Sequence, residues 1–184
     1  QRLSLQKEVD EKTKNLQYLN ENLELEVRKQ SEAFRKIFDK ASDGTFILYK
    51  SRFIECNEAA IKMFHLDSRD ELLHKHPSEI SPEYQPDGSS SLELSQEMIQ
   101  IAIDEGVNNF EWMHLKGNDE EFWADVTLTP ISLADRDIIH VIVRDISYQK
   151  HIQQELINQK SKLHHRANHD SLTKLPNREL FNDR

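Results

Sequence analysis

Apolar residues recur at alternating steps of three and four along the first 40 residues of the chain. Leu16, Leu19, Leu23 and Val27 carry this pattern, and charged or amide side chains occupy most of the other positions. The segment contains no Pro and no Gly, so it predicts one long helix over residues 1–38. Its apolar stripe is too narrow to pack on a globular core along the whole length, so we expect a parallel homodimeric coiled coil.

The end of this helix follows the same rhythm with larger side chains. Phe34, Ile37 and Phe38 stand next to the globular part of the sequence, and we expect them to pack on it. An amphipathic helix that folds back on its own domain along its whole length is the alternative to a coiled coil.

From residue 44 the pattern changes to the alternation of apolar and polar positions that is typical of β-strands. The sequence TFILYKSRFIEC is rich in β-branched and aromatic residues on both sides of Lys50 and Ser51, which predicts a β-hairpin. Asn57 is a suitable N-cap for a short helix that follows. After an irregular stretch, residues 92–105 predict a helix that ends at Gly106.

Three longer strands are predicted next, with the sequences NNFEWMHLK, EFWADVTLTPI and IIHVIVRDI, each closed by turn residues. Two short strands, a helical middle and three long strands predict an α+β domain over residues 39–147. We expect a five-stranded antiparallel sheet with helices on one face. A second coiled-coil helix is predicted over residues 148–168, where Ile152, Leu156 and Leu163 carry the apolar stripe.

The order of these elements resembles the PAS fold over about residues 32–147. The sequence CNEAA is similar to the Asn-containing step into the first short helix of PAS domains, and RDIS resembles the Asp-Ile-Thr sequence that leads into their C-terminal helix. Ser147 stands where Thr is usual and keeps the hydroxyl group. The resemblance implies that Asp145, Ile146 and Ser147 hand the signal over to the exit helix.

The last residues, 169–184, resemble the opening of GGDEF domains. The matching positions of the motif Asp-x-Leu-Thr-x-Leu-Pro-Asn-Arg are Asp170, Leu172, Thr173, Leu175, Pro176, Asn177 and Arg178. The resemblance implies a bacterial diguanylate cyclase of cyclic di-GMP signalling, with or without an EAL phosphodiesterase domain. The Mg²⁺-binding carboxylates and the GTP-binding loop of that family would lie beyond residue 184, so we expect no enzymatic activity of this chain itself.

A candidate ligand pocket lies on the face of the sheet that the helices are expected to cover. Strand alternation and the long middle helix select its lining: Met98, Ile101, Phe110, Trp112, His114, Phe122, Ala124 and Val126. Trp112 and His114 would hold a small ligand by stacking and hydrogen bonding. The favoured alternative is that these aromatic residues only fill the core.

The sequence predicts no cofactor and no metal. The long middle helix has no His to bind haem iron, and the cysteine motif of photoactive flavin domains is missing, so an unidentified small molecule is the remaining ligand. Cys56 is expected to be a buried small apolar residue. The pairs His165 and His169, and His74 and His76, are expected to be solvated rather than metal-bound, because carboxylate or cysteine partners are missing nearby.

Charge and composition restrict the partners of the chain. The 184 residues have a formal net charge of -9, and acidic residues far outnumber basic ones between residues 41 and 147. Such a domain is not expected to bind nucleic acid. One cysteine, no signal pattern and no long apolar run indicate a cytoplasmic chain without membrane contact, with an anchor further upstream as an alternative.

These features lead to two hypotheses. The first is a sensory and dimerisation module in which an event in the pocket alters the packing of the exit helix and so aligns two cyclase domains. The second is a ligand-free dimerisation and spacer domain in the same kind of protein.

Overall fold

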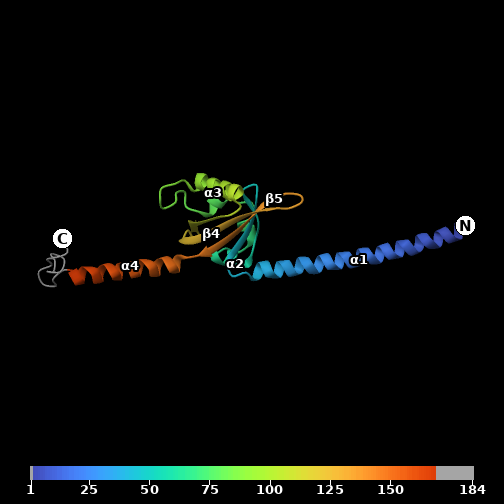
Figure 1. The fold of residues 1–184 in the computed structure, drawn as a ribbon, viewed down its shortest axis with the longest axis horizontal. Coiled ribbons are helices and arrows are strands. Elements are labelled where there is room, and N and C mark those ends of the chain that lie inside the picture. Colours follow the sequence, from blue (N-terminus) through green and yellow to red (C-terminus); the bar gives the residue numbers. More distant parts are fainter. Residues whose placement is uncertain (1, 169–184) are drawn as a thin grey trace.

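The computed structural model describes the backbone of residues 2–168 and the side chains of residues 11–163. A small globular domain lies between two helices that extend away from it in opposite directions (Figure 1). The elements in chain order are α1 (Arg2–Lys40), β1 (Gly44–Tyr49), β2 (Arg52–Cys56), α2 (Glu58–Met63), η1 (Arg69–Glu71), η2 (Pro77–Ile80), α3 (Ser91–Glu105), β3 (Asn108–Leu115), β4 (Glu121–Ser132), β5 (Asp137–Asp145) and α4 (Ser147–Asn168), where η marks a 3₁₀ helix.

The five strands form one antiparallel sheet in the order β2-β1-β5-β4-β3. This confirms the predicted α+β fold. The hairpin between β1 and β2 turns at Lys50 and Ser51, whose φ angles of 49° and 59° are both left-handed. Two left-handed turn residues match the twist of the flanking strands, so the hairpin closes with a two-residue turn.

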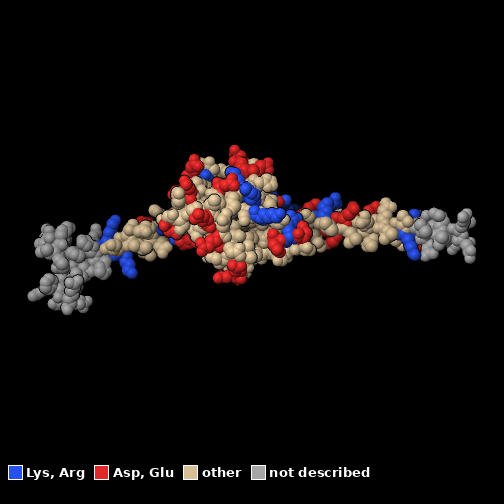
Figure 2. Space-filling view, turned by 90° about the horizontal axis from the view of Figure 1, so that it is seen from above, with Lys and Arg blue, Asp and Glu red and all other residues tan. Residues whose placement is uncertain are grey.

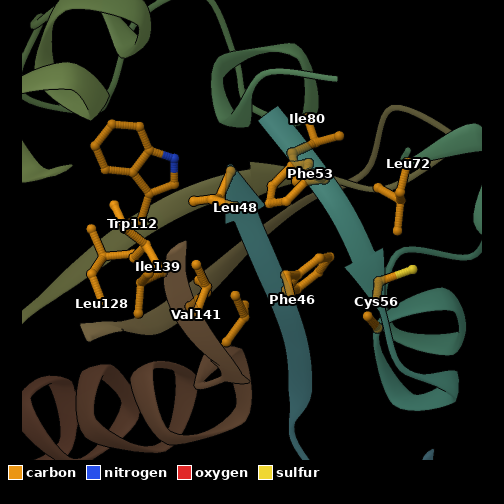
Figure 3. Close-up of a cluster of buried hydrophobic side chains, with 14 of the residues drawn as sticks. Phe46, Leu48, Phe53, Cys56, Leu72, Ile80, Trp112, Leu128, Ile139 and Val141 are labelled. Atoms are coloured by element: carbon orange, nitrogen blue, oxygen red, sulfur yellow. The ribbon is translucent and has the colours of Figure 1, made fainter. Parts of the chain in front are cut away.

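The core lies on one face of the sheet, below α2, η2 and α3. Alternate strand residues point into it, among them Phe46 and Leu48 of β1 and Trp112 of β3 (Figure 3). Phe46 and Phe64 are almost completely buried, and burial of one such side chain contributes about 1.5–3 kcal/mol to stability. Residues of the opposite parity, such as Ile47 and Ile142, are only half-buried.

Helix α3 presents a stripe of small and apolar residues to the sheet. Ser91, Ser95, Ile99 and Ala102 are its buried positions. The helix ends at Gly106, which has a left-handed φ of 88° and donates its N–H to the carbonyl of Ala102 at 2.9 Å. Gly106 therefore ends the helix as predicted, because glycine adopts this conformation without a steric penalty.

Helix α1 contacts the domain only through its last turns. Phe38 is buried, whereas Phe34 and Ile37 are 60% and 75% exposed. The expectation that all three pack on the domain was therefore wrong for Phe34 and Ile37. The helix leaves the domain in a straight line, so only the face that carries Phe38 packs on the domain, chiefly on α2 (Figure 1).

The charged residues of the globular domain are mainly acidic. Figure 2 shows Asp and Glu side chains spread over the face in view, together with one band of Lys and Arg. Among the helices that the structure describes, none combines the length and the apolar character needed to cross a membrane.

Candidate functional site

A cavity of about 40 Å³ lies between the sheet and the helices that cover it. Its lining comes from all five strands, from η2 and from α3. The lining residues are Phe46, Leu48, Phe53, Pro77, Ile80, Ser95, Ile99, Phe110, Trp112, His114, Val126, Leu128, Val141 and Val143, with β2 represented by Phe53. Figure 3 shows Trp112 standing beside Leu48, Leu128 and Ile139 at this place. The interior of the domain is therefore mostly filled but leaves one small apolar space.

The sequence placed some of the lining residues correctly on one face of the sheet. Register pairs the predicted residues across β3 and β4 as Phe110 with Val126, Trp112 with Ala124, and His114 with Phe122. The cavity lining includes Phe110, Trp112, His114 and Val126 of these. Phe122 and Ala124 are buried in the core cluster and do not line the cavity.

The two predicted residues of α3 do not line the cavity, and each lies one position before a buried residue of the helix. Met98 is half-buried and packs against the core, and Ile101 is half-buried. Ser95 and Ile99 line the cavity instead. The stripe of small residues at steps of three and four would have indicated this face, because side chains of that spacing share one side of a helix.

Residues of β1 and β5 also line the cavity, although the sequence did not predict them in the lining. Phe46 and Leu48 lie on β1, and Val141 and Val143 lie on β5. The alternation of apolar and polar residues in each strand can be recognised in the sequence. The pairing of β1 with β5 cannot, because most of the domain lies between these two strands in the chain. Only the sheet order brings them together.

His114, Ser81 and Trp112 form a buried polar cluster at the cavity wall. The Trp112 indole N–H donates to Ser81 Oγ at 2.9 Å, and Ser81 Oγ donates to the carbonyl of Pro77 at 2.9 Å. His114 Nδ1 lies 3.1 Å from the carbonyl oxygen of Ile80. Burial lowers the pKa of His114 to about 4, partly offset by the bond to Ile80. The imidazole is therefore neutral at pH 7.

The described residues contain no group of three or more potential metal-ligating side chains. His76 Nδ1 is within 2.8 Å of Ser78 Oγ, where it caps η2. Cys56 is completely buried at the end of β2, and burial raises the pKa of its thiol to about 11, so it is not a thiolate at pH 7. The side chain of His165 and all of His169 lie outside the described residues.

Asn57 ties the end of α1 to the sheet. Its Oδ1 accepts the N–H groups of Thr45 at 3.0 Å and Ala60 at 2.9 Å. Its Nδ2 donates to the carbonyls of Phe38 at 3.1 Å and Asp43 at 3.0 Å. All the hydrogen-bonding groups of this buried amide are thus paired, and they connect α1, β1 and α2 at one point.

Ion pairs strengthen the same junction. Arg69 in η1 contacts Asp39 of α1 at 2.5 Å and Glu55 of β2 at 3.2 Å. Arg35 of α1 contacts Glu55 at 3.0 Å. The last turns of α1 are therefore connected to β2 and to the irregular middle segment.

Residues 145–147 connect the start of α4 to β4. The Trp123 N–H donates to Ser147 Oγ at 3.0 Å, and the Ile146 N–H donates to the Trp123 carbonyl at 2.9 Å. The Ser147 N–H donates to Asp145 Oδ1 at 2.8 Å. Lys150 completes the junction, with its ammonium group 5.0 Å from the Trp123 ring centroid. One backbone position of β4 therefore holds the first turn of the exit helix.

The profile of the PAS domain matches residues 42–147. A search of curated proteins finds no match.

Several solved structures have the same fold. The PAS domain of a two-component sensor histidine kinase is 17% identical, with a TM-score of 0.54 over 65% of this chain and 98% of that chain. The PAS domain of an HTR-like protein from Haloarcula marismortui is 18% identical, with a TM-score of 0.55 over 68% and 99% of the two chains. A PAS domain from Colwellia psychrerythraea is 18% identical, with a TM-score of 0.54 over 66% and 98%.

Proposed function

This chain belongs to the PAS domain family, and we propose that it is a sensory and dimerisation module that signals to a C-terminal GGDEF diguanylate cyclase domain. PAS domains are sensory domains typical of signalling proteins, and the domain itself is non-catalytic. The observation that carries the proposal is the pair of helices that leave the domain in opposite directions with unpaired apolar stripes (Figure 1). Such an arrangement suits one input helix and one output helix.

The stripes support pairing with a second copy of the chain. All the predicted pairing residues whose exposure is described are at least 43% exposed: Leu16, Leu19, Leu23 and Val27 on α1, and Ile152, Leu156 and Leu163 on α4. The exposed Phe34 and Ile37 continue the α1 stripe as far as the domain. Pairing of two parallel copies would bury these side chains. Each side chain that is fully covered would stabilise the dimer by about 1.5–3 kcal/mol.

The path from the cavity to the exit helix is short. Trp112 at the cavity wall is paired with Ala124 in β4, and Ala124 is adjacent to Trp123, which holds Ser147 and Ile146. A change of the β3–β4 pair at this position would move the first turn of α4. Ligand binding would act by population shift, which requires different affinities for the two states of the dimer.

The cyclase assignment rests on the sequence motif of residues 169–184, which lie outside the described residues. Cyclic di-GMP is built from two GTP molecules held by opposed domains, so a dimer is required by the chemistry. A diguanylate cyclase and a protein with an additional EAL domain are equally compatible with this motif. The single buried Cys56 accords with a reducing cytoplasm, and the acidic surface disfavours nucleic acid.

The pairing is tested by replacing Leu19 and Leu23 together with Asp and measuring the mass in solution by light scattering. We expect a dimer for the native chain and a monomer for this variant. The matched control replaces Gln17 and Asn22 with Asp, which adds the same charge away from the stripe and is expected to remain dimeric. A monomeric native chain, or a Leu19→Asp/Leu23→Asp variant that stays dimeric, would refute the proposal.

A second candidate function is a ligand-free spacer that only dimerises. The observation that favours it is the tight interior, in which Trp112 is 3% exposed and the cavity measures only about 40 Å³. Native mass spectrometry of the purified chain separates the two functions. A dimer that carries an additional small mass supports the sensor, and a dimer of bare polypeptide that binds no small molecule in a screen supports the spacer.

A further inference from the structure

The cavity between the sheet and α3 has an almost purely apolar surface. Most of its lining side chains are those of Phe, Leu, Ile and Val, and no charged side chain of the described residues is among them. Only Ser95, Trp112 and His114 carry a polar group in their side chains. The partners of these three groups therefore decide what kind of molecule the cavity can hold.

All three polar side chains direct their hydrogen-bonding atoms away from the cavity. Ser95 Oγ donates to a carbonyl of its own helix at 2.9 Å, and the Trp112 indole N–H donates to Ser81 Oγ at 2.9 Å. His114 Nδ1 lies 3.1 Å from the carbonyl oxygen of Ile80, and its Nε2 is enclosed by protein with almost no accessible surface. Polar atoms consequently contribute almost nothing to the surface of the cavity.

Such a cavity suits an apolar occupant better than water. A trapped water needs about two to four polar partners, and apolar cavities stay dry. The side chains around an empty space lack dispersion contacts on one side, and a small apolar molecule would supply them. A volume of about 40 Å³ is roughly three times the smallest space that holds one water, which fits a molecule of about three or four heavy atoms.

We propose that this cavity binds a small apolar molecule that has no hydrogen-bonding group. The inference rests on the proposed sensory function, for which it names the class of ligand. Alcohols, amines and ions are disfavoured, because a polar group in this cavity would lose its hydrogen bonds to water and gain none. The hydrogen bond to a ligand that the sequence suggested for Trp112 and His114 has no accessible polar atom to form it.

The test is a titration of the native chain at pH 7, with ¹³C-labelled methyl groups of Ile, Leu and Val followed by NMR. The probes are propane and ethanol, which have the same number of heavy atoms and nearly the same shape. We expect saturable shifts of the lining methyl groups of Leu48 and Ile99 with propane, and no shift of the exposed Leu92 and Ile103 on α3. Propane is expected to bind at least about tenfold tighter than ethanol, whose hydroxyl would be left unpaired.

Two variants assign the binding to the cavity. Val141→Ile adds one methylene group to a buried lining residue. It is expected to weaken propane binding about fourfold, because the added group takes the place of one methylene group of the ligand. Val107→Ile makes the same change at an exposed position between α3 and β3, and it is expected to bind propane like the native chain.

The native chain alone can overturn the inference, whether or not the variants fold. The absence of a saturable shift with propane, ethanol binding as tight as propane binding, or shifts of Leu92 and Ile103 as large as those of the lining methyl groups would each refute it. Light scattering of the same samples reports pairing separately. A dimer without propane binding would refute only the ligand class, and a monomer that binds propane would refute only the proposed dimeric module.

Discussion

Lowering the pH from 7 to 5 is expected to destabilise the globular domain through His114. Burial lowers the pKa of this residue from 6.5 to about 4. In the unfolded chain the imidazole regains its ordinary pKa and takes up a proton as the pH falls below about 6.5. The folded domain takes up that proton only near pH 4. The contribution of the neutral His114 to the free energy of unfolding is therefore fully present above pH 6.5 and is lost as the pH falls towards the pKa of the folded state.

The magnitude follows from the two pKa values. At pH 5 the unfolded histidine is almost fully protonated and the folded one almost fully neutral, which lowers the free energy of unfolding by about 2 kcal/mol relative to pH 7. The full effect, reached below pH 4, is about 3 kcal/mol. His76 and His140 also have pKa values lowered by burial, so the native chain loses stability through them in the same range.

The contribution of His114 is isolated by comparison with variants that do not titrate. Urea unfolding at pH 7 and at pH 5 is measured for the native chain, His114→Gln and His114→Phe. Both variants are expected to lose about 2 kcal/mol less than the native chain between the two pH values. If the native chain and the variants have the same pH dependence, His114 is not a buried neutral histidine.

Three further predictions concern stability at pH 7. Asn57→Ala leaves several buried backbone groups unpaired and is expected to lower the free energy of unfolding by about 2–4 kcal/mol in urea titrations. The control Asn118→Ala, at an exposed position, is expected to change it by no more than about 0.5 kcal/mol. Equal losses would contradict the role of the buried amide. Trp112→Ala is expected to cost about 3–5 kcal/mol by calorimetry, more than Trp123→Ala at a half-buried position, and the reverse order would place the core on the other face. Gly106→Ala is expected to cost about 1 kcal/mol because its φ of 88° disfavours a side chain although the space is open; a stabilised variant would contradict this backbone conformation.

Much of the fold followed from local patterns in the sequence. The hairpin at Lys50 and Ser51, the helix end at Gly106 and the N-cap at Asn57 depend on the chemistry of a few neighbouring residues. Strand alternation likewise assigned Trp112 and His114 to one buried face. Backbone preference and side-chain periodicity depend on a few neighbouring residues, so both can be recognised directly in the sequence.

Other features depend on residues that lie far apart in the chain. The sequence did not show that Asn57 also pairs with Phe38 in the entry helix, or that Trp123 holds Ser147. The sequence predicted Met98 and Ile101 of α3 in the lining instead of Ser95 and Ile99, because the rotation of a helix on a sheet is set by packing and not by the helix alone.

The elements, their order and the apolar stripes of the two long helices could be predicted from the sequence, since periodicity and turn chemistry are local properties. Which parts of those elements are covered depends on the folded structure, which leaves Phe34 and Ile37 exposed and Phe38 buried. The folded structure alone placed His114 Nδ1 against the Ile80 carbonyl and the Trp112 indole N–H against Ser81 Oγ. Pairing of buried polar atoms depends on distances between segments that meet only after folding, and no local pattern encodes those distances.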